Sequence, residues 1–189
     1  MTVGKRSNFA RRDRDSYNTP LGAVLPLLAR LDPDVSFVEP CAGAGYLTRW
    51  LESAGHTCLG EYDLPTDART ARYDIPPGAA FITNPPFWGR PADLHPLISN
   101  LSDQAPAWLL LPADWPHNQS SAPLMPRLRM VISVGRVKWL PGTKHTSLDN
   151  VVWALFGAPS DQAVHCVGRP ADLPFKPSGY RFVKGRLAA

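Results

Sequence analysis

The sequence predicts a single α/β domain whose core is a doubly wound, mostly parallel β-sheet that ends in an antiparallel hairpin. Short apolar segments alternate along the chain with amphipathic, helix-like segments, an order that is typical of βαβ units. The last two apolar segments, 131–140 and 151–156, are too close for a helical crossover and are expected to form the hairpin. With 189 residues, 44% of them hydrophobic, the chain can bury one globular core.

The individual elements follow from apolar spacing and from the prolines and glycines that interrupt it. Leu21, Leu25 and Leu28 recur at helical intervals, and Gly55 follows a second amphipathic segment as a glycine does at a helix end. Helices are predicted over 16–31, 44–55, 91–101 and 122–130. Strands are predicted over 35–40, 56–64, 79–83, 107–112, 131–140 and 151–156.

The two ends of the chain are basic and its middle is mildly acidic. Residues 1–15 carry five basic and two acidic side chains, and residues 169–189 carry five and one, which gives +3 and +4. Since the whole chain has a net charge of +4, the middle holds −3. We therefore expect a basic, flexible N-terminal arm (1–15), a globular domain (16–168) and a basic C-terminal segment (169–189). Such ends suit phosphate backbones, and solvated tails have the same composition.

Cysteine usage and hydropathy exclude several classes of protein. The three cysteines, Cys41, Cys58 and Cys166, are odd in number and widely spaced, which argues against a disulfide framework and against a zinc site. No apolar run reaches the roughly 18 residues that a membrane span needs, and the first residues are too polar for a cleaved signal. We expect a soluble, cytoplasmic protein with no bound metal and no membrane partner. The composition leaves its oligomeric state open.

One strand is expected to end on two consecutive prolines. The segment 79–83 is apolar and runs directly into Asn84, Pro85 and Pro86. A strand cannot continue through these prolines, because each lacks the amide hydrogen that a sheet needs. The proline after Asn84 also restricts its backbone to an extended conformation, so the side-chain amide is held at a fixed place beyond the strand. A proline-rich surface loop is the alternative.

A glycine turn follows the first strand. In the segment 38–50, VEPCAGAGYLTRW, an acidic residue ends the strand, two glycines form the turn and a helix begins immediately. The glycines allow backbone amides to approach a ligand, and Glu39 can accept hydrogen bonds from a ligand ammonium or hydroxyl. Glu61 and Tyr62 end the next strand, where a carboxylate meets ribose hydroxyls in this architecture. A tight strand-to-helix turn without a ligand is the alternative. The absence of GxGxxG argues against a nicotinamide enzyme.

The segment EPCAGAG, 39–45, resembles the first motif of the Rossmann-like methyltransferases that use S-adenosyl-L-methionine. The resemblance implies that the turn approaches the methionine part of this cofactor, that Glu61 binds the ribose with Tyr62 packed on the purine, and that Asp74, with Ile75 after it, contacts the adenine. A solvated surface aspartate is the alternative for Asp74. The turn residues to which the resemblance assigns cofactor contact are Glu39, Pro40, Cys41, Ala42, Gly43 and Gly45.

The NPPF sequence of residues 84–87 resembles the catalytic motif of amino methyltransferases, most often DNA adenine-N6 enzymes of the small phage type. The adenine amine is a poor nucleophile because its lone pair is delocalised into the ring. The Asn84 side-chain oxygen and the Pro85 carbonyl can accept the two amine hydrogens and so localise the lone pair, with Pro86 keeping the acceptors rigid. The base must leave the duplex to be reached, and Phe87 is expected to stack on it, with Trp88 beside it.

Two further segments are assigned by the same resemblance. The sequence YNTP, 17–20, resembles the motif that covers the cofactor, which assigns Tyr17, Thr19 and Pro20 to the cofactor site. Thr19 as an N-cap with Pro20 in the first helical turn is a reading that is compatible with this one. Sequence reading by the enzyme is expected from the loops 112–122 and 141–150. In the second loop Lys144, His145, Thr146 and Ser147 suit phosphates or base edges.

Other functions share parts of this pattern. Release-factor glutamine-N5 methyltransferases carry a glycine turn and an NPP motif, but they usually have Tyr after the prolines and a helical substrate domain ahead of the fold. RNA adenine methylation is chemically equivalent at this site, whereas cytosine-N4 enzymes more often have Ser in place of Asn84. A silent binding module is expected to lose the site residues that this chain keeps. The sequence therefore favours transfer of a methyl group from S-adenosyl-L-methionine to adenine N6 in DNA.

Overall fold

The computed structural model describes residues 17–86, 91–140, 146–147, 149–169, 181–183 and 186–188. The predicted N-terminal arm lies outside these ranges, and so do four of the predicted site residues: Phe87, Trp88, Lys144 and His145.

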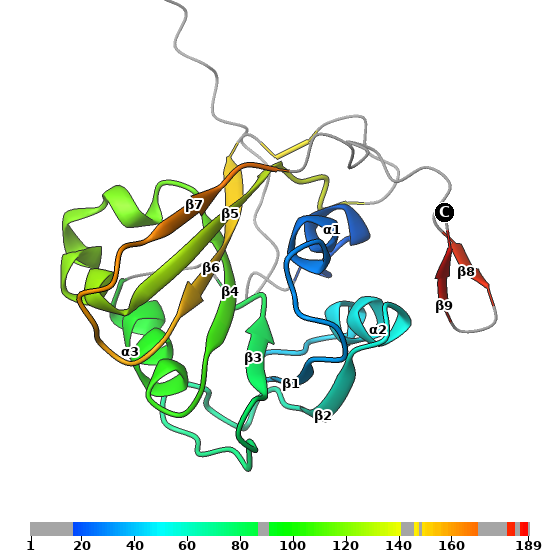
Figure 1. Cartoon of the computed structure of the whole chain (residues 1–189), viewed down its shortest axis with the longest axis horizontal. Coiled ribbons are helices and arrows are strands. Elements are labelled where there is room, and N and C mark those ends of the chain that lie inside the picture. Colours follow the sequence, from blue (N-terminus) through cyan, green and yellow to red (C-terminus); the bar gives the residue numbers. More distant parts are fainter. Residues whose placement is uncertain are drawn as a thin grey trace, which may run out of the picture.

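The core is a seven-stranded sheet with the order β2-β1-β3-β4-β6-β5-β7 (Figure 1). The strands are β1 (Ser36–Glu39), β2 (Thr57–Glu61), β3 (Ala80–Thr83), β4 (Ala107–Pro112), β5 (Leu128–Arg136), β6 (Asn150–Phe156) and β7 (His165–Val167). The pairs β1–β2, β1–β3, β3–β4 and β5–β7 are parallel, while β6 runs antiparallel to both β4 and β5. The predicted fold class is therefore confirmed, including the hairpin of β5 and β6.

Helices cover both faces of the sheet. Figure 1 shows α1 (Leu21–Leu28) and α2 (Tyr46–Ser53) on one side and α3 (Pro91–Ser102) on the other. Side chains alternate between two cores accordingly, as adjacent residues of a strand must. Phe37 packs in the core under α1 and α2, while its neighbour Val38 packs in the core under α3. In a sheet buried on both faces the strands are continuously apolar, which explains why β4 reads AWLLLP.

The remaining elements differ from the expectation in ways that prolines explain. The segment 122–130 is not an α-helix but a 3-10 helix, Gln119–Arg127, that contains Pro123 and Pro126, followed by β5. Each internal proline removes an amide donor that an α-helix needs. A second short 3-10 helix is Trp115–His117. No helix lies between β2 and β3 in the structure, so the alternation of strands and helices is broken there.

Three short strands were not expected from the sequence. The strand β7 is three residues long and largely exposed, so it lacks the apolar pattern that predicts strands. The strands β8 (Arg181–Val183) and β9 (Arg186–Ala188) form a separate antiparallel pair within the predicted basic C-terminal segment. In the part of the chain that the structure describes, no helix is both long enough and apolar enough to cross a membrane.

Candidate active site

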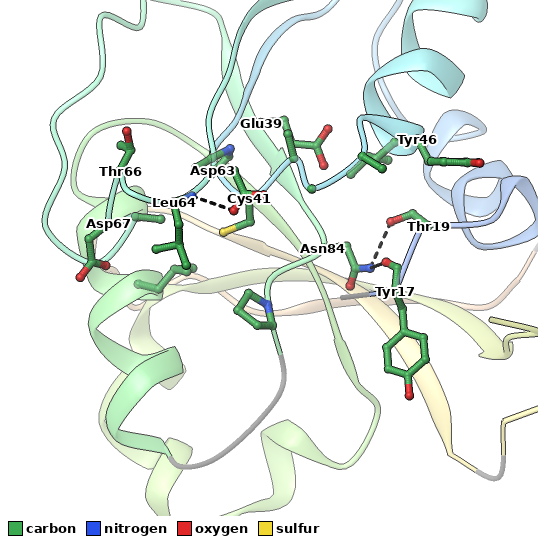
Figure 2. A pocket seen from close by; sticks show the side chains of 18 of the residues that line it. Tyr17, Thr19, Glu39, Cys41, Tyr46, Asp63, Leu64, Thr66, Asp67 and Asn84 are labelled. Atoms are coloured by element: carbon green, nitrogen blue, oxygen red, sulfur yellow. Dashed lines mark hydrogen bonds between the residues drawn. The ribbon is translucent and has the colours of Figure 1, made fainter. Parts of the chain in front are cut away.

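A cavity of about 700 Å³ opens beyond the carboxyl ends of β1 and β3 (Figure 2). In open α/β sheets ligands bind at this edge, and the volume lies in the range of small-molecule and cofactor sites. Its walls come from the segment before α1, the turn after β1, the connection after β2, the residues after β3 and one face of α3. The predicted site residues that line it are Tyr17, Thr19, Glu39, Pro40, Cys41, Ala42, Gly43, Asn84 and Pro86.

The glycine turn is shaped by left-handed backbone and by a close approach. Gly45 has a φ of 68° and is the residue that precedes α2. A Cβ at this position would lie 2.9 Å from Oε1 of Glu61, closer than non-bonded atoms approach. Within the turn the Gly45 amide donates to the carbonyl of Ala42, and the Ala42 amide donates to the carbonyl of Tyr62. The left-handed backbone therefore favours glycine at position 45, whereas the exposed Glu61 side chain is free to move away from a Cβ.

Glu39 is a buried acid at the end of β1, with 1% of its surface exposed. Its Oε2 accepts hydrogen bonds from the Thr48 amide at 3.1 Å and from the Thr48 hydroxyl at 2.6 Å. Burial raises the pKa of the Glu39 carboxyl from 4.5 to about 8; nearby Glu61 and Asp63 also raise it, while the bonds from Thr48 oppose the shift. A positive charge in the cavity would favour the ionised carboxylate, so Glu39 suits a cationic ligand.

Asn84 lines the cavity, and two hydrogen bonds fix the orientation of its side-chain amide. The amide nitrogen Nδ2 donates to the Thr19 hydroxyl at 3.1 Å and to the carbonyl of Tyr17 at 3.4 Å (Figure 2). Because a backbone carbonyl can only accept, the nitrogen must face Tyr17 and the oxygen must face away from it. The Asn84 oxygen is buried and has no hydrogen-bond partner among the residues that the structure describes. The arrangement therefore leaves one acceptor, fixed in direction, for a ligand N–H.

The segment before α1 is anchored to two other elements. The carbonyl of Thr19 accepts a hydrogen bond from the Trp50 indole of α2 at 3.1 Å. The ring of Tyr17 lies 6.1 Å, between centroids, from the ring of Trp139, which follows β5. Thr19 does not act as the N-cap of α1: Pro20 occupies that position, and no side chain caps the helix. Its hydroxyl bonds to Asn84 instead, 65 residues further along the chain.

Two acids after β2 that the sequence did not single out also line the cavity. Asp63 and Asp67 follow β2 and face the cavity, whereas Glu61 and Tyr62, which end that strand, are not among the described lining residues. Asp74 is exposed and Ile75 packs into the core under α3, and neither lines the cavity. The sequence EYDLPTDAR does carry a signal, since acids recur directly after the expected strand end. The roles that the resemblance assigns to Glu61, Tyr62, Asp74 and Ile75 stay predictions.

Two ion pairs lie in the wall of the cavity beside α3. Arg69 contacts Asp67 and Asp93 at 2.8 Å each, and all three side chains line the cavity. Asp93 lies in the first turn of α3, so the bridge joins this helix to the connection after β2. Of the predicted substrate-binding residues, Thr146 is exposed. The Ser147 amide donates to the carbonyl of Val137, so Ser147 lies just beyond the end of β5.

No protein-family model and no curated protein matches the sequence. Solved structures do match. A candidate RNA methyltransferase from Pyrococcus horikoshii is 13% identical with a TM-score of 0.55, over 81% of this chain and 91% of that one. The modification subunit of a candidate type I restriction enzyme from Vibrio vulnificus is 12% identical with a TM-score of 0.52, over 84% of this chain and 48% of that one. The type IIG restriction endonuclease BpuSI is 13% identical with a TM-score of 0.50, over 78% and 26%.

These matches identify the architecture. The chain shares the Rossmann-like fold of these solved structures. The chain spans about half of the restriction modification subunit and about a quarter of BpuSI. Among the described residues, no group of three or more His, Cys, Asp or Glu side chains is arranged to hold a metal ion.

Proposed function

We propose that the protein transfers a methyl group from S-adenosyl-L-methionine to the N6 amino group of adenine in DNA. The observation that carries this proposal is the Asn84 side-chain oxygen, which is buried, unpartnered and fixed in direction beside the cavity. Such an acceptor is what a planar amine needs, because accepting one of its hydrogens helps to localise the nitrogen lone pair.

The cavity suits S-adenosyl-L-methionine in charge as well as in size. Its described lining contains four acidic side chains, those of Glu39, Asp63, Asp67 and Asp93, and one basic side chain, that of Arg69. The cofactor carries a sulfonium and an ammonium against one carboxylate, so it is a cation that this lining favours. It supplies an electrophilic methyl group. The protein orients that group and the amine in line, which removes roughly 7 to 11 kcal/mol of barrier in well-oriented reactions.

The roles of the protein's residues follow from their positions. Asn84 and the Pro85 carbonyl accept the amine hydrogens while Thr19 and Tyr17 hold the Asn84 amide. As nitrogen bonds to the methyl carbon, the carbon–sulfur bond breaks, sulfur retains the electron pair, and the amine loses a proton to water. No metal takes part in this scheme.

A nucleobase substrate is favoured by the aromatic side chains around Asn84. Tyr17 lines the cavity, its carbonyl accepts from Asn84, and its ring lies against that of Trp139. Stacking on an aromatic ring holds an extruded base. Phe87, which the NPPF resemblance assigns to stacking, follows Pro86 directly. A glutamine side chain needs the amide acceptors but no stacking surface.

The test is incubation of the wild type, Asn84→Ala and Asn84→Asp with radiolabelled S-adenosyl-L-methionine. Unmethylated duplex DNA, RNA and a release factor are offered separately, and labelled products are identified by nucleoside and amino-acid analysis. We expect label in N6-methyladenine of DNA with the wild type only. Asn84→Asp keeps the oxygen acceptors but loses the donation to Tyr17 and Thr19, so it separates acceptor chemistry from orientation. Label confined to protein or to RNA would refute DNA as the substrate.

A further inference from the structure

A β-bulge near the end of β5 turns two cationic side chains outward. Between Ser133 and Gly135 this strand has one residue more than β6 has opposite, and Gly135 adopts a φ of 90°. Ile132 before the bulge and Val134 within it are buried, whereas Arg136 and Lys138 after it are exposed. Strict alternation would have continued inward at positions 136 and 138, so the extra residue reverses their direction.

A third cation lies at the bulge. The Arg169 guanidinium donates to the carbonyl of Val134 at 3.0 Å, and Val134 is the residue that the bulge leaves without a partner on β6. Neither Arg136 nor Lys138 forms an ion pair within the described residues. The one acid next to them in the hairpin is Asp149, which precedes the residue paired with Arg136. Three positive side chains and one negative side chain therefore lie at this end of the hairpin. We call Arg136, Lys138 and Arg169 the bulge surface.

The bulge surface lies at the same edge of the sheet as Asn84. Because β5 is antiparallel to β6, and β6 is antiparallel to β4, β5 runs in the direction of β3 and β4 (Figure 1). Its carboxyl end therefore lies at the same edge of the sheet as the carboxyl end of β3, after which Asn84 follows, with β4 and β6 between the two strands. Side chains link the two points: Trp139 follows Lys138 and contacts the ring of Tyr17, whose carbonyl accepts from Asn84.

We propose that the bulge surface binds the phosphate backbone of the nucleic acid beside the target base. This inference rests on the proposed function and adds to it the surface that holds the substrate. Exposed cations such as Arg136 and Lys138 can neutralise phosphates and release counterions, which ties affinity to salt concentration. Phosphate contacts fix the position and register of the nucleic acid, so this surface sets where the base is presented to Asn84.

The test measures binding of a short mixed-sequence duplex by fluorescence anisotropy across a salt series, with a non-reactive cofactor analogue present. In Arg136→Gln/Lys138→Gln the slope of log K against log salt should fall by about 1.8, or about 0.9 per phosphate contact. The loss of affinity between about 50 and about 200 mM salt should then be about 12-fold smaller than in the wild type.

Two variants serve as controls. Asp149→Asn removes the opposing charge and should tighten binding, the opposite direction from the double variant. Arg72→Gln removes an exposed cation beside Ala71, whose carbonyl accepts from Asn100 near the end of α3 and from Gln104 just after it, and it should leave the slope unchanged. Cofactor binding by titration calorimetry should be equal in all four proteins.

The outcomes separate this inference from the proposed function. A wild type that binds and methylates DNA, with a slope that the double variant leaves unchanged or that Arg72→Gln lowers equally, overturns the bulge surface alone. A wild type that methylates only a protein substrate and binds no nucleic acid overturns both.

Discussion

The hydrogen bond between Thr19 and Asn84 is the most direct way to test the orientation of the catalytic amide. Thr19→Val keeps the shape of the side chain and removes the hydroxyl that accepts from Asn84 at 3.1 Å. Thr19 is 4% exposed, so water does not replace this acceptor easily. The Asn84 nitrogen would keep only the Tyr17 carbonyl, at 3.4 Å. We expect the amide to become mobile while the fold is retained.

The size of the effect follows from the loss of one buried hydrogen bond. Leaving a buried donor partly unsatisfied costs about 1 to 3 kcal/mol. If that cost falls on the orientation required in the transition state, kcat decreases by about 5- to 150-fold. Affinity for the methyl donor should change little, because the hydroxyl acts through Asn84. A loss in kcat with constant affinity is the mark of an interaction that matters only in the transition state.

The assay is steady-state methyl transfer with saturating donor, together with donor affinity by calorimetry. Thr19→Ser is the matched control, since it keeps the hydroxyl, and its kcat should stay within a few-fold of the wild type. Equal kcat values for Thr19→Val and Thr19→Ser, with Asn84→Ala inactive, would refute the role of Thr19 in holding the amide.

Three further predictions concern charge. The folded-state pKa of Glu39, about 8, is above its ordinary value of 4.5, so the folded protein binds more protons than the unfolded protein between these values. The folded protein therefore loses stability as the pH rises from about 5 to about 8. Thermal melting of the cofactor-free protein should show a weaker pH dependence in Glu39→Gln than in the wild type, and identical pH profiles would contradict this prediction. Asp63→Asn removes one negative charge from the cavity lining and should weaken binding of the cationic donor more than binding of its neutral, demethylated product, as calorimetry can compare; equal effects would exclude a charge role. Deletion of residues 1–14 removes five basic and one acidic side chain and should lower the salt slope of DNA binding without changing donor affinity, whereas an unchanged slope would remove the arm from the binding surface.

The fold could be predicted because its signals are local. Apolar alternation, strand-ending prolines and the glycine turn each act over a few residues, and the short distance between β5 and β6 along the chain determines that they pair directly. Prolines also explain where the expectation was wrong, as in the 3-10 helix that contains Pro123 and Pro126. The strand β7 was missed because three largely exposed residues carry no periodicity.

Only the site residues that lie at strand ends could be predicted from the sequence. Asn84 and Glu39 end strands and could be placed at one edge of the sheet, whereas the bond from Asn84 to Thr19 spans 65 residues and has no local signal. Asp63 and Asp67 lie in a connection without regular structure, so no periodicity indicates which of its acids face the cavity. The bulge at Gly135 had a weak signal, a glycine inside an expected strand, but its consequence for Arg136 required the pairing with β6.

The choice between adenine and glutamine as the acceptor depends on what surrounds Asn84 rather than on Asn84 itself. Both carry a planar NH2 group with a delocalised lone pair, and both need the same oxygen acceptor. The Tyr17 ring adds an aromatic side chain to the cavity lining, and the bulge surface adds cations at the same edge of the sheet. A base requires the first and a phosphate backbone the second, while a peptide glutamine requires neither. Each of these features therefore favours a nucleic-acid substrate separately. The salt series tests the bulge surface without depending on the target sequence.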